Sequence, residues 1–454
     1  MQDIVKGSIN IDRPIRLLCC NIPTTACNLK CNYCYVDRKR FPNAPPTRMY
    51  EPELIARALT QERLGGKAYL QLCGYGETFM DPLIVEVSER LLRNGHYVAL
   101  STNGTVRKIN DIFCAFPQEL KERLHFFISI QWEELKRLNL LNQYAENVRN
   151  IKACDISMSV SVTLSDSLVP EIPSIKEYCL KEFGVLCHIL ECRDERRSDI
   201  PRMTELPIEE HQRLWGSFDS PTFEWQQVYW GQHRNEFCYM GESAMYLDFS
   251  SGNIWQACLG KKLCNIFDDL NEPIRFCALG RNCNVAHCYL GNILLGLGGV
   301  VPEIQYPSFA SQRDRICPDG TTWFTPKVRD FFHQRVINNL PPYSESKKIY
   351  IDTVMAIVYG HKPRETVDKL RSLLSKALNK SGIKSCNIQG CTKPLGKWLY
   401  ELLQGTEFDV RRLSERLLGA DMTIITEYDD FPNIRNSLAN KGVNNIVSIL
   451  DIIV

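Results

Sequence analysis

The sequence has no excess of charge of either sign, since 54 lysines and arginines stand against 53 aspartates and glutamates, for a formal net charge of +1. No overall field attracts nucleic acid or a membrane surface, and we expect neither as a partner. Long hydrophobic runs are lacking as well. The longest nearly uncharged apolar stretch, residues 292–301 (NILLGLGGVV), is shorter than the about 20 residues of a membrane-spanning helix. The first twenty residues lack the pattern of a secretory signal, so we expect a cytoplasmic protein.

Cysteine is abundant, with 20 residues in a chain of 454. Disulfides are rare in a reducing compartment, so clustered cysteines there are more often metal ligands or catalytic groups. Isolated cysteines are most simply small, buried apolar residues. We expect this of Cys19, Cys20, Cys114, Cys154, Cys179, Cys187, Cys386 and Cys391.

Six apolar segments separated by helical ones organise the first half of the chain. Strands are predicted at residues 15–22, 68–73, 97–101, 125–130, 157–164 and 187–191. Strands that alternate with helices predict βαβ units and a parallel sheet. Six strands over about 180 residues fit a curved or partly closed βα barrel, in which functional residues gather at the carboxyl ends of the strands. We therefore predict an α/β fold with a partial (β/α)6 barrel over residues 1–220.

The rest of the chain divides into two further predicted domains. Residues 221–335 are rich in loop residues and cysteine, and residues 336–454 have the pattern of a small Rossmann-like α/β domain. In the latter, Lys348–Tyr359 is apolar and β-branched, and strands are predicted at 384–388, 422–426 and 445–450. The turn Gly390–Gly396 (GCTKPLG) lacks the G-x-G-x-x-G spacing of a dinucleotide site. We assign this domain no ligand; substrate recognition and oligomerisation both suit it.

The segment CNLKCNYC places Cys27, Cys31 and Cys34 on a short loop after the first strand. Three thiolates can ligate three irons of a [4Fe–4S] cube. The missing fourth ligand leaves one iron open, as in catalytic zinc sites. The alternative is a zinc loop, but zinc sites favour paired CxxC units and no fourth ligand is near in the sequence.

Two later segments follow in the order of one enzyme family. Gly74-Tyr-Gly-Glu77 ends the second predicted strand, and Ser101-Thr-Asn-Gly104 ends the third. With the cysteine loop, in which Tyr33 precedes the third cysteine, residues 15–200 resemble the radical S-adenosylmethionine (radical SAM) superfamily. One departure from the family's glycine-glycine-glutamate motif is Tyr75, which lies between Gly74 and Gly76.

The resemblance implies a [4Fe–4S] cluster, S-adenosylmethionine and a set of cofactor-binding residues. These are Tyr33, Gly74, Gly76, Glu77, Ser101, Asn103 and Ser129, with Thr163 and Glu191 as weaker candidates. Arg193 could pair with the carboxylate of S-adenosylmethionine, although a solvated charged loop explains that segment as well. The family transfers one electron to S-adenosylmethionine and so forms a 5′-deoxyadenosyl radical that removes a hydrogen atom from the substrate. The implied electron donor is a protein such as flavodoxin or ferredoxin.

A second set of cysteines lies in the middle region. Cys238 and Cys258 flank a predicted hairpin with a Ser-Ser-Gly-Asn turn, and Cys283 and Cys288 form a close pair. The set resembles the auxiliary-cluster extensions called SPASM and twitch, although one residue more than usual separates Gly252 from Cys258. It implies one auxiliary [4Fe–4S] cluster; Cys264, Cys277 and Cys317 could replace a ligand or hold a second cluster. A structural zinc site is the alternative, and His287 is a ligand or, more simply, a hydrogen-bond donor beside it.

Three functions remain open from the sequence. The first is oxidation or epimerisation of a small molecule, such as a sugar or a nucleotide-linked compound. The second is modification of a peptide, as in many relatives with auxiliary clusters. The third, a metal-binding scaffold without activity, leaves Glu77 and the segment 101–103 without a purpose. We favour the small molecule because the first cluster cysteine is residue 27, which leaves no room for an amino-terminal winged-helix peptide-binding domain.

Overall fold

The computed structural model describes residues 13–34, 48–256, 260–413 and 419–453. They divide into two compact units. The first comprises the described residues up to 233 with 248–251 and 285–340, and the second comprises 234–247, 252–284 and the rest from 341. The three-domain division with boundaries at 220 and 335 remains a prediction.

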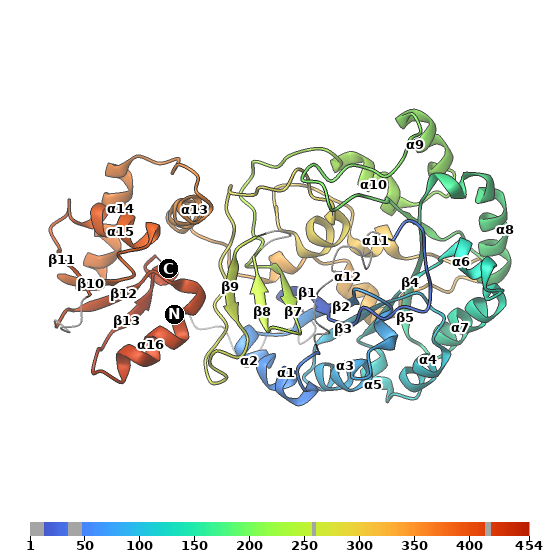
Figure 1. Ribbon diagram of the computed structural model, residues 1–454, viewed down its shortest axis with the longest axis horizontal. Helices are drawn as coiled ribbons and strands as arrows, with labels where there is room; N and C mark the ends of the chain where they lie inside the picture. Colours follow the sequence, from blue (N-terminus) through green and yellow to red (C-terminus); the bar gives the residue numbers. More distant parts are fainter. Residues whose placement is uncertain (1–12, 35–47, 257–259, 414–418, 454) are drawn as a thin grey trace. The chain divides into compact units, whose positions relative to one another are not determined.

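The first unit is built on six parallel strands that follow one another in chain order (Figure 1). They are β1 (Arg16–Ile22), β2 (Ala68–Gly74), β3 (Tyr97–Thr102), β4 (Leu124–Ser129), β5 (Ser157–Thr163) and β6 (His188–Leu190). All five neighbouring pairs are parallel, so every connection crosses over and returns to the same edge. The six predicted strands are confirmed, and their order is that of an α/β barrel core.

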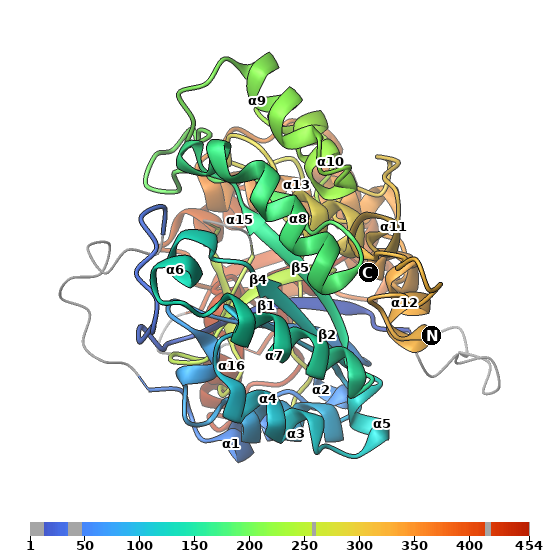
Figure 2. The same cartoon turned by 90° about the vertical axis from the view of Figure 1, so that its right-hand side faces the viewer.

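Helices supply the crossovers. They are α1 (Pro52–Ala58), α2 (Gln61–Leu64), α3 (Ile84–Arg93), α4 (Arg107–Cys114), α5 (Gln118–Lys121), α6 (Trp132–Arg137), α7 (Leu141–Ala153) and α8 (Ile172–Phe183). Figure 2 shows α7 and α8 in front of β4 and β5. Side chains on the helix-covered face, such as Leu72, Leu100 and Ile128, are fully buried.

The opposite face of the strands, which we call the inner face, is accessible. The strand register brings Asn21, Cys73, Ser101, Phe127 and Ser159 into one row across β1 to β5. Cys73 is exposed, and its neighbours Asn21, Ser101 and Phe127 are only half-buried. Because strand side chains alternate between faces, this row opens onto space that helices do not fill.

Later segments of the first unit close the amino-terminal part of the inner face. They include the π-helix η3 (Asn292–Gly298), α11 (Phe309–Arg313), α12 (Pro326–Phe332) and η4 (Val336–Asn339). Two further helices, α9 (Ile208–Gly216) and α10 (Pro221–Tyr229), contact Glu191 just beyond the end of β6. Phe331 packs on Tyr97 with ring centroids 4.7 Å apart, and Phe332 packs on Tyr69 at 5.6 Å. The apolar run 292–301 is therefore a buried element of the core.

The second unit contains an antiparallel set and a parallel sheet. The antiparallel set is β7 (Ala244–Asp248), β8 (Asn253–Trp255) and β9 (Lys262–Asn265), which confirms the predicted hairpin. The parallel sheet has the order β11 (Asp409–Arg412), β10 (Ser385–Gln389), β12 (Met422–Ile425), β13 (Ile446–Ser448). Its helices are α13 (Glu345–Tyr359), α14 (Val367–Lys380), α15 (Pro394–Leu403) and α16 (Phe431–Ala439).

Two features of this unit differ from what composition favours. The β-branched segment Lys348–Tyr359 lies in helix α13, whose central residues Tyr350–Ala356 are buried. Packing around a buried helix outweighs the modest helix penalty of β-branched residues. Strand β11 was not predicted, because its sequence DVRR has one buried apolar residue among charged ones.

Two isolated cysteines correct an expectation. Cys114, at the end of α4, and Cys154, after α7, are half-buried and joined in a disulfide with Cα atoms 5.4 Å apart. Cys114 is the last residue of α4 and Cys154 directly follows α7, so both lie at helix ends and neither thiol is packed as a fully buried apolar group. Cys179, Cys187 and Cys386 are fully buried as expected, and Cys391 is half-buried. No helix among the described residues has the length and apolar character to cross a bilayer.

Candidate functional site

The cysteine loop lies at the carboxyl end of β1, next to the start of α6. Cys27 and Cys31 are half-buried and Cys34 is exposed. Tyr33 is 9% exposed, and its hydroxyl donates a hydrogen bond to the side-chain oxygen of Gln131. The Cys31 thiol lies 3.5 Å from the same oxygen. The amide of Lys30 donates to the Glu134 carboxylate at 2.7 Å. Residues at the amino end of α6 thus fix the middle of the loop.

The three thiols are close enough to influence one another. Burial and the neighbouring thiols of Cys34 and Cys27 raise the pKa of Cys31 to about 12. Among the described residues, no three His, Cys, Asp or Glu side chains gather tightly enough to hold a single ion. A [4Fe–4S] cube binds each thiolate to a different iron, so its ligands stand farther apart than those of one ion. The donor set and its spacing on one loop therefore fit a cube, whose iron would take the place of the thiol protons.

The segment Gly74–Glu77 is hydrogen-bonded to the entry of the cysteine loop. The amide of Gly76 donates to the carbonyl of Thr24, and that of Glu77 donates to the carbonyl of Ala26, both at 2.8 Å. A Cβ atom at residue 76 would lie 2.1 Å from the Ala26 oxygen. The glycine is therefore required for close approach of this backbone to the cysteine loop.

The Glu77 carboxylate is buried, at 3% exposure, and holds two strand ends together. One oxygen accepts from the hydroxyl of Thr102 at 2.5 Å and from the amide of Phe79 at 3.1 Å, and the other accepts from the amide of Asn103 at 2.7 Å. Burial raises the pKa of Glu77, against the effect of these hydrogen bonds. A carboxylate has about four acceptor positions, so three are used within the protein.

Asn103 connects the end of β3 to the cysteine loop. Its side-chain nitrogen donates to the side-chain oxygen of Asn28 at 2.9 Å, and the Asn28 nitrogen donates to the Thr105 hydroxyl at 2.7 Å. Thr105 in turn donates from its amide and hydroxyl to the Asn103 side-chain oxygen. The Ser101–Gly104 segment is thus brought next to Cys27, as the motif order predicted.

The other predicted cofactor residues lie at strand ends on the inner face. Ser101, Ser129 and Thr163 are half-buried at the ends of β3, β4 and β5. The sequence analysis missed Cys73, which lies beside Ser101. Desolvation raises the pKa of its thiol, against a smaller lowering by a hydrogen bond with Ser101. The sequence analysis also missed Thr102, Gln131 and Glu134. Their positions, directly at or after strand ends, were the available signal.

Glu191 and Arg193 have partners within the protein. The Glu191 carboxylate is buried and accepts from Arg202 at 3.1 Å, Gln227 at 2.7 Å and His211 at 3.2 Å. Arg193 pairs with Glu195 at 2.7 Å and lies over the ring of Tyr289, 5.0 Å from its centroid. Arg193 is thus packed, with a side chain 12% exposed, whereas Arg196 and Arg197 of the same segment are solvated, as the expectation of a charged loop has it.

The second set of cysteines is distributed over both units. Cys238 is buried and Cys283 half-buried in the second unit, whereas the half-buried Cys288 belongs to the first; Cys258 lies outside the described residues. Cys264, Cys277 and Cys317 are buried, and Cys317 accepts from the Lys152 ammonium at 3.2 Å. His287 is 2% exposed, and burial with Arg202 and Arg193 lowers its pKa to about 4. An auxiliary cluster on these residues remains a prediction.

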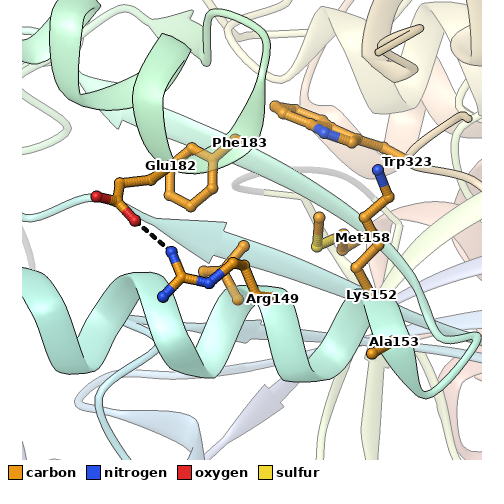
Figure 3. A pocket seen from close by; sticks show the side chains of 8 residues that line it. Arg149, Lys152, Ala153, Met158, Glu182, Phe183 and Trp323 are labelled. Carbon is orange, nitrogen blue, oxygen red and sulfur yellow. Dashed lines mark hydrogen bonds and ion pairs between the residues drawn. The ribbon is translucent and has the colours of Figure 1, made fainter. Parts of the chain in front are cut away.

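A cavity of about 420 Å³ lies between α7, α8 and the start of β5 (Figure 3). Its lining includes Lys152, Met158, Phe183 and Trp323, and Arg149 at its rim is ion-paired with Glu182. Met158 is the second residue of β5, so the cavity is at the amino end of the strands. The cysteine loop and the strand-end polar residues are at the carboxyl end, where α/β barrels carry their chemistry.

Residues 21–131 match the model of the Radical SAM superfamily, so this part of the chain carries a radical SAM domain. No curated protein matches the chain.

Among solved structures, the chain is similar to Streptococcus suis SuiB bound to S-adenosylmethionine, with 14% identity and a TM-score of 0.42. The match covers 57% of this chain and 65% of SuiB, less than two thirds of that protein. SuiB bound to the precursor peptide SuiA matches with 13% identity and a TM-score of 0.41, over 57% of this chain and 64% of SuiB. Native anSMEcpe with bound AdoMet matches with 16% identity and a TM-score of 0.39, over 56% of this chain and 79% of that one.

Proposed function

We propose that the chain is a radical SAM enzyme in which Cys27, Cys31 and Cys34 ligate a [4Fe–4S] cluster. When bound, the cluster and S-adenosylmethionine supply a 5′-deoxyadenosyl radical that removes a hydrogen atom from the substrate. The protein's own part is to hold the cofactors in place, to exclude water and to position the substrate at the inner face.

One observation carries the proposal: three segments far apart in the sequence form a single hydrogen-bonded assembly. Glu77 donates from its amide to Ala26, next to Cys27, and its carboxylate accepts from Thr102 and Asn103. A metal-binding scaffold without activity would need the cysteine loop alone. The free acceptor position of Glu77 suits the amino group of S-adenosylmethionine, and Gly74 has no side chain to occupy the strand end beside it.

The finer parts of the function are proposals of the same kind. We favour a small-molecule substrate, a sugar or nucleotide-linked compound, that is oxidised or epimerised, with flavodoxin or ferredoxin as electron donor. A peptide substrate is the alternative. Cys238, Cys258, Cys283 and Cys288 are the proposed ligands of an auxiliary cluster, which would accept an electron from the substrate radical. A neighbouring gene for a short precursor peptide would favour the peptide, whereas glycosyltransferase genes would favour the small molecule.

The test is anaerobic reconstitution with iron and sulfide, followed by iron analysis of the wild type and of a Cys27/Cys31/Cys34 triple alanine variant. About eight irons that fall to about four indicate two clusters, and about four that fall to none indicate one. 5′-Deoxyadenosine formation from S-adenosylmethionine with dithionite should be lost in the triple variant. Equal iron content in both proteins, or cleavage retained by the variant, would contradict the proposal. The half-buried Cys391, replaced by serine, is the matched control and should change neither quantity.

A further inference from the structure

Arg313 is a buried cation without a charged partner in the part of the chain that the structure describes. The residue is only 9% exposed, its side chain makes no hydrogen bond or ion pair with a described residue, and its Nε atom is fully buried. Its guanidinium instead makes described cation–π contacts with two aromatic rings. The guanidinium carbon lies 5.6 Å from the Phe127 ring centroid and 5.9 Å from that of Phe309. An unpaired buried charge is costly to fold, so an anion is expected beside it.

Three neighbouring polar groups on the inner face also have no described partner. They are the hydroxyl of Tyr69, both ring nitrogens of His125 and the hydroxyl of Ser159, and each of these residues is 1% exposed. His125 packs on Phe127 with ring centroids 4.5 Å apart, and Ser159 faces Phe127 in the β4–β5 register. Tyr69 and His125 both pack on Phe332, with ring centroids 5.6 and 5.3 Å from it. Buried polar groups in folded proteins almost always have a partner, so several such groups in one region are unusual.

The electrostatics of this cluster are positive. The ionisable neighbour that affects the pKa of His125 is Arg313. The pKa of Tyr69 is affected by Arg313 and by the thiol of Cys19. The pKa of Arg313 is affected by the phenols of Tyr229 and Tyr69. No carboxylate is among these groups. Burial raises the pKa of Tyr69 and lowers that of His125, so the phenol keeps its proton and the imidazole is neutral with one N–H to donate.

The cluster is connected to the accessible part of the inner face. Phe127, under the guanidinium, lies in the same row as the half-buried Ser101 and the exposed Cys73. That row leads to the strand ends that carry the cysteine loop and Glu77. A molecule held at the strand ends can therefore extend a charged group toward Arg313.

We propose that Arg313, Tyr69 and His125 form a binding site for a carboxylate or phosphate group of the substrate. Guanidinium, phenol and neutral imidazole all donate hydrogen bonds, and the guanidinium offers the planar pair of donors that matches these anions. Ser159 adds a hydroxyl at the edge of the site. The inference rests on the proposed function in one respect, that the anion belongs to the molecule on which the radical acts.

The first test is thermal unfolding of the full-length protein in sodium phosphate and in sodium chloride at matched ionic strength. At saturating phosphate, the Tm of the wild type should rise by about 2 to 4 °C relative to chloride. Arg313→Met should lose this rise, and Arg313→Lys should keep part of it. Arg107→Met, which removes a half-exposed arginine from α4, should respond as the wild type does. Equal phosphate shifts in the wild type and Arg313→Met would overturn the proposal.

A second variant covers the case in which Arg313→Met does not fold. Tyr69→Phe removes one unpartnered hydroxyl and leaves the ring that packs on Phe332. It should weaken phosphate binding several-fold without lowering the Tm in chloride. A Tyr69→Phe variant with the phosphate response of the wild type and a lower Tm in chloride would count against the site.

A third measurement distinguishes the substrate from the cofactor, which also has a carboxylate. On reconstituted protein, the Kd of S-adenosylmethionine should agree within twofold between the wild type and Arg313→Met. A large loss of affinity would assign the anion to S-adenosylmethionine and overturn the proposal. If the wild type binds no S-adenosylmethionine, the proposed function fails, whereas the phosphate measurement still decides whether the anion site exists.

Discussion

The side-chain nitrogen of Asn103 lies 2.9 Å from the side-chain oxygen of Asn28, across 75 residues of sequence. Asn28 follows Cys27 directly, and Asn103 follows the last residue of β3. The hydrogen bond therefore joins the residue after a proposed cluster ligand to the residue after a central strand. Since Asn28 itself is exposed, this contact and that with Thr105 hold the side chain in one place.

Replacing Asn103 by alanine should loosen the cysteine loop and leave the fold intact. The variant loses the bonds to Asn28 and Thr105, which costs about 1 to 3 kcal/mol because the buried amide and hydroxyl of Thr105 are left without this partner. We expect faster loss of iron from the reconstituted variant to a chelator. Asn110→Ala, at a buried asparagine whose side chain has no described partner, is the control for loss of a buried asparagine side chain. An unchanged rate of iron loss in Asn103→Ala would mean that the bridge does not hold the loop.

Gly76→Ala should displace the entry of the cysteine loop. The added methyl group would lie 2.1 Å from the Ala26 oxygen and 2.7 Å from the Thr25 carbonyl carbon, which are backbone atoms. Such overpacking costs about 1 to 3 kcal/mol. We expect a lower Tm and a large loss of bound iron. Gly216→Ala is the matched control because, apart from its chain neighbours and its own helix backbone, no described atom lies within 4 Å of its added Cβ. Normal iron content in Gly76→Ala would show that the loop can move without losing the cluster.

Glu77→Gln should change how stability depends on pH. Burial raises the pKa of the Glu77 carboxyl in the folded protein above its ordinary value of 4.5. Its contribution to stability is therefore complete below the ordinary value and is lost as pH rises through the folded-state pKa. The free energy of unfolding of the wild type, relative to the variant, should decrease as pH rises above the ordinary value of 4.5, as measured by denaturant unfolding of the iron-free protein.

A difference that instead grows with pH would mean that the hydrogen bonds from Thr102, Phe79 and Asn103 outweigh the cost of burial. Such a result would assign Glu77 a depressed pKa in solution. In Glu77→Gln, a side-chain amide replaces the carboxylate that accepts from the amides of Phe79 and Asn103. The NH2 group of this amide cannot accept a hydrogen bond, so the affinity of the variant for S-adenosylmethionine should be lower at every pH.

The Cys114–Cys154 disulfide should stabilise the iron-free protein under oxidising conditions. It closes a segment with a sequence separation of 40 residues between α4 and α7. Bridges of this kind contribute about 2 to 4 kcal/mol. Thiol titration of the oxidised, unfolded protein should find two fewer thiols than the 20 cysteines of the chain. Cys114→Ala should lower the Tm under oxidising conditions and leave it unchanged under reducing ones. A full count of 20 thiols would show that the bridge does not form.

The sequence by itself determined the strands and the proposed ligands of the first cluster. Alternation of apolar strands with helices predicts parallel βαβ units, and the CxxxCxxC spacing puts three thiols on one loop. The ends of the second and third strands were also readable, because parallel strands present their carboxyl ends at one edge. These signals are local, and each depends on periodicity or spacing within one short segment.

Only the tertiary structure decided what these segments do for one another. It showed that Gly76 is a glycine because the Ala26 backbone lies against it, and that Glu77 holds two strand ends as well as facing the site. No pattern in the sequence singled out Arg313, because its proposed role depends on the absence of a described carboxylate beside it in the folded protein. The pairing of Cys114 with Cys154 was equally invisible. Such contacts join residues far apart in the chain, so they depend on packing and register, which no local pattern specifies.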